Sequence, residues 1–104
     1  MPMVIGTLSL ALHLHGVHSL KEKRRVVKRI LLRVRNTFNV SAAEVADLDA
    51  HERSRLAFVS TGNDARKLNS RMDKILNFIE EMHLAEIVAH SIDVFHEPDV
   101  GEGF

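Results

Sequence analysis

The segment from Val4 to Leu14 alternates between large apolar side chains and smaller or more polar ones with a period of two. Such a period places successive side chains on opposite faces of a β-strand. One face carries Val4, Leu8, Leu10, Leu12 and Leu14, and the other carries Ile5, Thr7, Ser9, Ala11 and His13. We therefore expect a long strand with one face in the core, ended by Gly16.

Two later segments show the apolar spacing that is typical of amphipathic helices. The first, from about residue 20 to about residue 38, begins with Ser19 and Glu22 at capping-box spacing. The second, from about residue 65 to about residue 83, follows the turn Gly62-Asn63-Asp64, which supplies an aspartate as helix cap. The expected apolar faces are Leu20, Val27, Ile30, Leu31, Val34 and Phe38 in the first helix, and Leu68, Met72, Ile75, Leu76, Ile79 and Met82 in the second.

Three short segments, residues 40–45, 56–61 and 87–95, have the apolar and β-branched content of strands, and the polar residues 47–53 indicate a loop. The order is then β-α-β-β-α-β. With right-handed crossovers, this order predicts a ferredoxin-like α+β two-layer sandwich, a four-stranded antiparallel sheet with two helices on one face. At 104 residues we expect a single domain, residues 1–104, with an acidic flexible tail from about residue 98.

Charge is distributed very unevenly along the chain. Eight of the fourteen basic residues fall within residues 21–35, where Glu22 is the only acidic one. The segment carries a formal charge of +7, so the rest of the chain must carry −7 to give the net charge of zero. Lys23 falls toward the apolar side of the expected helix. The other basic residues occupy the outer half, where like charges four residues apart repel one another.

An anionic partner would offset this repulsion, and we expect that partner to be RNA or a ribosomal subunit, bound through its phosphates. The residues assigned to nucleic-acid binding are Lys21, Arg24, Arg25, Lys28, Arg29 and Arg33. Two alternatives stay open: the basic helix docks on an acidic protein surface, including that of a second copy, or it is a solvated helix face. The open sheet face lacks the aromatic side chains that stack bases in RNA-recognition domains, and it is suited to a homodimer.

A run of three histidines is the only pattern that suggests a metal site. His13, His15 and His18 have the spacing H-x-H-x-x-H, and the first two share one side of the expected strand. This spacing matches no standard metal site, and we find no cysteine or nearby carboxylate to complete it. The sequence therefore leads us to assign no metal ligand.

No catalytic motif accompanies these features. Glu44, Asp47 and Asp49 form a carboxylate cluster near a loop, for which solvated side chains are the favoured interpretation. The chain has no cysteine, no stretch long enough to span a membrane and no secretory signal at its start. We expect a soluble, cytoplasmic binding module that is not an enzyme and that needs no cofactor.

Several motifs resemble the YlxP-like family of small, uncharacterised bacterial proteins. The most specific is SLKEKRR at residues 19–25, and weaker matches lie at residues 38–45, 48–50 and 62–64. The resemblance implies a ferredoxin-like fold and the bacterial cytoplasm. It also implies a link to ribosome assembly or translation, because genes of the family often lie beside those of translation initiation factors and ribosome-binding factor A. His51 stands where the resemblance predicts a tryptophan, so any partner contact that this aromatic makes in relatives is not expected here.

Overall fold

The strands and helices follow the order expected from the sequence. They are β1 (Met3–His13), α1 (Leu20–Thr37), β2 (Ser41–Ala46), β3 (Arg53–Gly62), α2 (Ala65–Met82) and β4 (Glu86–Glu97). The computed structural model describes residues 3–98, so the tail expected beyond that point lies outside the described residues. Among the described residues, neither helix is both long and apolar enough to cross a membrane.

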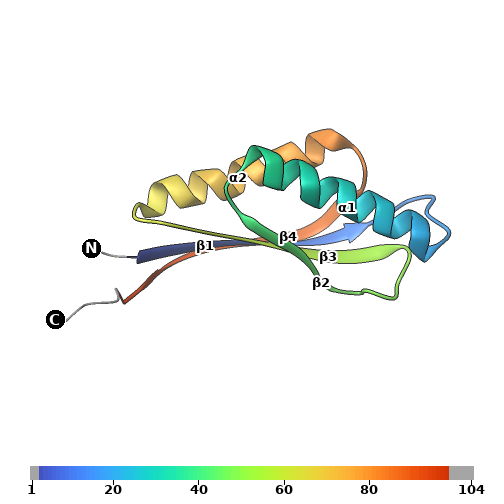
Figure 1. Ribbon diagram of the computed structural model, residues 1–104, viewed down its shortest axis with the longest axis horizontal. Helices are drawn as coiled ribbons and strands as arrows, with labels where there is room; N and C mark the ends of the chain where they lie inside the picture. Colours follow the sequence, from blue (N-terminus) through green and yellow to red (C-terminus); the bar gives the residue numbers. More distant parts are fainter. Residues whose placement is uncertain (1–2, 99–104) are drawn as a thin grey trace.

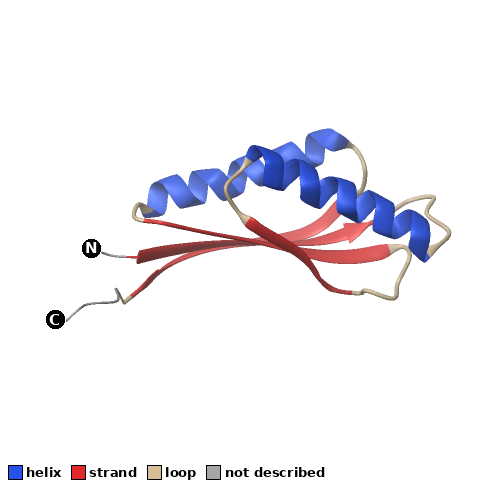
Figure 2. Ribbon diagram, in the orientation of Figure 1, coloured by secondary structure: helices blue, strands red, loops and turns tan. Residues whose placement is uncertain are grey.

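The sheet has the strand order β2-β3-β1-β4, and every neighbouring pair is antiparallel. Both helices lie on the same face of this sheet (Figures 1 and 2). The ferredoxin-like two-layer sandwich is therefore confirmed. Because both helices cover the same face, no helix of the described residues lies against the opposite face of the sheet.

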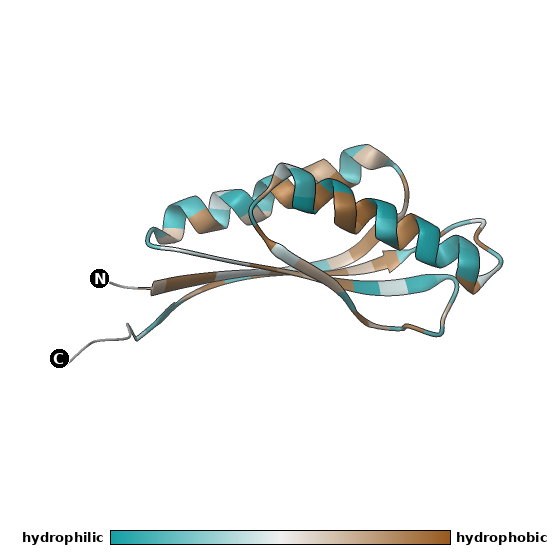
Figure 3. Cartoon of the chain, viewed as in Figure 1, coloured by the Kyte–Doolittle hydropathy of each residue, from teal (hydrophilic) through white to brown (hydrophobic). Residues whose placement is uncertain are grey.

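The core lies between the sheet, mainly β1 and β3, and the two helices. Along β1 and just after it, Val4, Leu8, Leu10, Leu12 and Leu14 are at most 2% exposed, as the alternation predicts. Apart from Val4, they belong to one core cluster with Leu56 and Phe58 of β3, Val27, Ile30, Leu31 and Val34 of α1, and Met72, Ile75 and Ile79 of α2. Both helices alternate between hydrophilic and hydrophobic colour in Figure 3, as amphipathic helices do. A one-residue slip of β1 would expose its whole leucine face, so burial determines its register.

Both helices begin at the expected caps. The hydroxyl of Ser19 accepts a hydrogen bond from the Glu22 amide at 3.1 Å, and one carboxylate oxygen of Asp64 accepts from two amides in the first turn of α2 at 3.0 and 3.2 Å. The Glu22 carboxylate accepts from the amide of His18 at 3.1 Å. In a standard capping box the glutamate accepts from the amide of the cap residue, here Ser19. Glu22 instead accepts from the amide of the preceding residue, His18.

The expected start of β3 was three residues too late. Arg53, assigned to the preceding loop, pairs with His13 of β1, and Ser54, assigned to neither the loop nor the strand, pairs with Leu12. Ser54 is polar yet only 1% exposed, so it occupies a core position without an apolar signal in the sequence. For this reason the alternation of β3 could not be recognised before residue 56.

Candidate nucleic-acid interface

The outer face of α1 presents all six assigned basic residues to solvent: Lys21, Arg24, Arg25, Lys28, Arg29 and Arg33. No ion pair within residues 3–98 involves any of these six side chains. Leu32, placed among them by the sequence, is 43% exposed. The expected cationic surface therefore exists as a continuous helix face, and its charge is not neutralised by the described acidic residues.

The second helix enlarges this basic surface, and its contribution was not predicted from the sequence. Of the fourteen lysines and arginines, eight lie on α1 and four on α2; the other two are on β3. The two helices carry only four acidic residues. Since α1 and α2 lie on the same face of the sheet (Figure 1), the helix layer is strongly basic. The residues that α2 adds are Arg66, Lys67, Arg71 and Lys74.

A hollow of about 420 Å³ lies where the end of α1 meets the first half of α2. Its lining residues are Phe38, Asp64, Arg66, Lys67, Ser70, Arg71 and Lys74. Arg71 donates a hydrogen bond to the hydroxyl of Ser60, which holds its guanidinium against β3. Arg66, Lys67 and Lys74 are exposed at the hollow. The helix layer is therefore concave and cationic at this point.

Arg33 links the two helices. Its guanidinium carbon lies 5.7 Å from the centre of the Phe78 ring of α2, a cation–π distance. Phe78 in turn meets Phe38 edge-on, with ring centres 5.4 Å apart. These contacts orient one of the six assigned cations and leave the aromatic rings of the helix layer packed on each other.

Lys23 is the one basic residue of α1 that turns inward. It is 0% exposed, and its ammonium group lies 2.7 Å from Oε2 of Glu44. The same group donates to the carbonyl oxygens of Asp47 and Leu48 at 2.6 and 3.5 Å. The position of Lys23 on the apolar side of the helix was the only sequence signal for this contact.

The interpretation of Glu44 as a solvated loop carboxylate is wrong. Glu44 lies in β2, its side chain is 14% exposed, and it accepts a hydrogen bond from the Ser54 hydroxyl at 2.5 Å as well as pairing with Lys23. Asp47 lies 3.5 Å from Nε of Arg55, and Asp49 is exposed. The three carboxylates thus have different surroundings, and the first has a structural partner.

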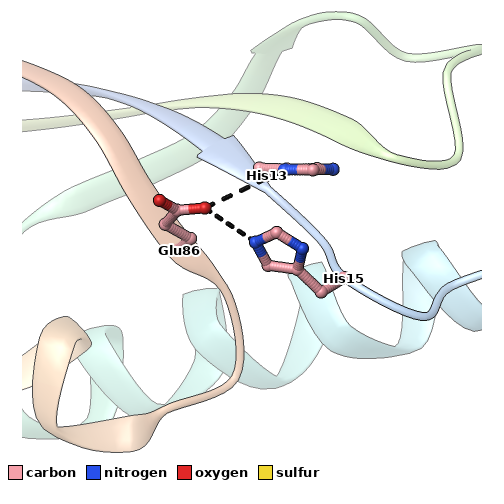
Figure 4. A group of neighbouring side chains, drawn as sticks. All are labelled: His13, His15 and Glu86. Atoms are coloured by element: carbon pink, nitrogen blue, oxygen red, sulfur yellow. Dashed lines mark hydrogen bonds and ion pairs between the residues drawn. The ribbon is translucent and has the colours of Figure 1, made fainter.

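The fold places His13 and His15 beside Glu86 (Figure 4) and leaves His18 out of this group. Nε2 of His15 lies 2.7 Å from Oε1 of Glu86 in β4, and Nδ1 of His13 lies 3.9 Å from the same oxygen. The expectation that no nearby carboxylate completes the run is therefore wrong, because β1 pairs with β4 and brings Glu86 opposite His13. His18 is not part of this group, and its amide donates to Glu22 at the start of α1.

The open face of the sheet exposes several large apolar side chains. Val45, Val59 and Phe95 are 57%, 41% and 41% exposed. The open sheet face is separate from the basic helix layer and offers an apolar contact surface, not a cationic one.

His51 lies in the loop before β3, where its Nε2 is 3.6 Å from a carboxylate oxygen of Glu52.

Comparisons with known proteins agree on the family and the fold. The profile of the family described as "Protein of unknown function (DUF503)" matches residues 5–92. Over 77 residues the chain is 34% identical to "Uncharacterized protein YlxP" of Bacillus subtilis (strain 168), which covers 74% of this chain and 84% of that protein.

Two designed proteins share the fold. One is the de novo designed protein LFR1 1 with ferredoxin fold, at a TM-score of 0.50 and 15% identity over 100% of this chain and 92% of that one. The other is the de novo designed protein Foldit4, at a TM-score of 0.50 and 15% identity over 93% of this chain and 98% of that one. At such identities the likeness shows the fold alone.

Proposed function

The chain belongs to the DUF503 family, and we propose that it is a non-enzymatic binding module whose basic helix layer contacts the phosphates of structured RNA. The observation that supports this proposal is the exposed row of six cations on α1, none of which forms an ion pair within residues 3–98. Each cation that meets a phosphate releases condensed counterions, and this release supplies binding energy without base recognition. Ribosomal RNA is the first target to test, because the genes of the family it resembles often adjoin translation genes.

The chemistry of the helix layer favours phosphate contacts over base contacts. The chain has no tyrosine or tryptophan, and Phe38 and Phe78 of the helix layer pack on each other. Base stacking needs free aromatic faces, so sequence-selective recognition of single strands is not expected at this surface. Binding should therefore be sensitive to salt and weakly selective for sequence.

The decisive experiment compares binding to ribosomal subunits and to a short RNA duplex from about 50 to about 300 mM salt. About five to six neutralised phosphates predict a slope of about −4.5 to −5.5 in the logarithmic plot of affinity against salt. The charge-reversed variant is Arg24→Glu, Arg25→Glu, Lys28→Glu and Arg29→Glu combined, and we expect it to lose binding. Absence of wild-type binding at the lowest salt would exclude the RNA proposal.

A matched control separates charge from shape. Arg24→Lys, Arg25→Lys and Arg29→Lys combined keep all positive charges and the helical preference of the segment. This variant should retain most of the affinity and the salt slope, whereas the charge-reversed one should not. Circular dichroism and urea unfolding of both variants establish that any lost binding is not lost folding.

Competition distinguishes RNA from an acidic protein surface. Poly-L-glutamate carries carboxylates without phosphates, so it should displace the RNA duplex only at a large excess of charge. If equal charge of poly-L-glutamate displaces the duplex completely, the basic helix recognises anionic surfaces in general. In that case the alternative, docking on an acidic protein or a second copy, becomes the better interpretation.

A homodimer through the open sheet face is a second candidate, favoured by the exposed Val45, Val59 and Phe95. Sedimentation equilibrium of the wild type should show dimers, and Phe95→Asp should shift them to monomers. A wild type that stays monomeric across the concentration range would exclude this assembly. A dimer formed through the open sheet face would leave both helix layers exposed, so RNA binding and dimerisation are compatible.

A further inference from the structure

The ends of β1 and β4 bring two imidazoles and a carboxylate together at the protein surface. His13 is the register partner of Glu86, and His15 follows two residues later in the chain. One donor atom from each of the three residues lies within 4.8 Å of the other two. Figure 4 shows both rings close to the same carboxylate. The three side chains come from segments about 70 residues apart, and only the β1–β4 pairing brings them together.

The distances suit a small metal ion. Neighbouring donor atoms around tetrahedral zinc, at bond lengths of about 2.0–2.1 Å, lie about 3.3 Å apart. Oε1 of Glu86 lies 2.7 Å from Nε2 of His15 and 3.9 Å from Nδ1 of His13, one separation below that value and one above it. All three donor atoms lie within 4.8 Å of one another, so side-chain rotations can bring them around one ion. The backbone arrangement therefore already provides a three-ligand set.

The donor types select the class of metal. Two imidazole nitrogens and one carboxylate oxygen suit zinc, nickel and copper, whereas magnesium and calcium prefer oxygen ligands throughout. Three protein ligands also leave a position open for water. We propose that His13, His15 and Glu86 bind one Zn²⁺ per chain, independently of the RNA surface on the helices.

The affinity should be moderate. The side chains of His13, His15 and Glu86 are 40%, 65% and 54% exposed, so binding must order solvated groups. Within residues 3–98, no further hydrogen bond to a carboxylate or carbonyl orients these rings. Such supporting contacts normally raise metal affinity, and without them the site should be weaker than a buried structural zinc site. Binding should still stabilise the fold, because the three ligands come together only in the folded chain.

The test uses the full chain without a histidine tag, treated with EDTA and dialysed. Isothermal titration with ZnCl₂ should give one ion per chain, and Zn²⁺ should raise the unfolding temperature. Co²⁺ should give visible absorption bands that disappear when Zn²⁺ is added. His13→Ala, His15→Ala and Glu86→Gln should each weaken Zn²⁺ binding at least about tenfold, the lower bound for losing even a supporting contact.

His18→Ala is the matched control, because His18 belongs to the sequence run but not to the structural cluster. This variant should bind Zn²⁺ as the wild type does. The proposal is overturned if the wild type shows no saturable binding, if His18→Ala weakens binding as much as His15→Ala, or if His15→Ala and Glu86→Gln leave binding unchanged. Urea unfolding without metal should differ little between the variants, because the three side chains are largely exposed, and this comparison separates lost ligation from lost folding.

Discussion

The buried ammonium group of Lys23 lies 2.7 Å from the Glu44 carboxylate and ties the first turn of α1 to β2. Carbonyl oxygens of Asp47 and Leu48 accept its other hydrogen bonds, and the Ser54 hydroxyl donates to Glu44. No buried side-chain polar atom of the described residues lacks a partner. The basic helix is thus anchored by the one lysine of its cluster that cannot meet an external anion.

Breaking this pair from one side should be costly. Glu44→Ala would leave the Lys23 ammonium buried with carbonyl partners alone, and we expect a loss of about 3–5 kcal/mol in unfolding free energy. Lys23→Met combined with Glu44→Leu removes both charges, so it should cost much less than the summed losses of Lys23→Met alone and Glu44→Leu alone. Urea unfolding of the two single variants and the double variant measures this coupling. Additive losses would contradict the pairing.

The close approach of α2 to β1 depends on Gly6. A Cβ atom at Gly6 would lie 3.3 Å from both Cβ and Cδ1 of Leu68, which is buried. Gly6→Val should therefore push α2 outward and cost about 1–3 kcal/mol of unfolding free energy. At Gly16 no atom of residues 3–98 lies within 4 Å of such a Cβ, so the cost expected for Gly16→Ala comes from its φ of +74°. Equal stability of wild type and Gly6→Val would show that the helix can move freely.

The N-terminal cap of α2 depends on the carboxylate of Asp64, so substitutions of this residue test it. Asp64→Ala removes the acceptor of two amide hydrogen bonds and should cost about 1 kcal/mol. Asp64→Asn keeps an acceptor and should cost about a few tenths of a kcal/mol at most. Thermal and urea unfolding compare the two. Asn63→Ala, at an exposed position beside the cap, should behave as the wild type.

The proposed RNA surface predicts opposite effects of one substitution on stability and on binding. Arg29 lies on α1 four residues from both Arg25 and Arg33, so Arg29→Glu changes two repulsive pairs into two attractive ones. We expect the unfolding free energy to rise by about 0.5–1 kcal/mol while RNA affinity falls. Urea unfolding and a binding titration at fixed salt measure both. A variant that is more stable and binds RNA as well as the wild type would argue that the basic face is only a solvated surface.

Much of the candidate interface could be predicted from the sequence, because helical periodicity alone determines which side of α1 is basic. The contribution of Arg66, Lys67 and Lys74 could not, since it depends on α2 lying on the same face of the sheet as α1. The partner of Lys23 could not be predicted from the sequence either. Its acceptors are a strand carboxylate and two loop carbonyls about 20 to 25 residues away in the chain.

The sequence by itself determined the order of elements, the buried faces and both helix caps, because each rests on interactions between residues a few positions apart. Tertiary structure alone decided which distant side chains meet. The β1–β4 register brings Glu86 close to His13 and His15, and the packing of α1 on the sheet places Lys23 beside Glu44. Such pairings arise from strand register and layer packing, which no local pattern records. The candidate metal site and the anchor of the basic helix therefore became visible only in the folded chain.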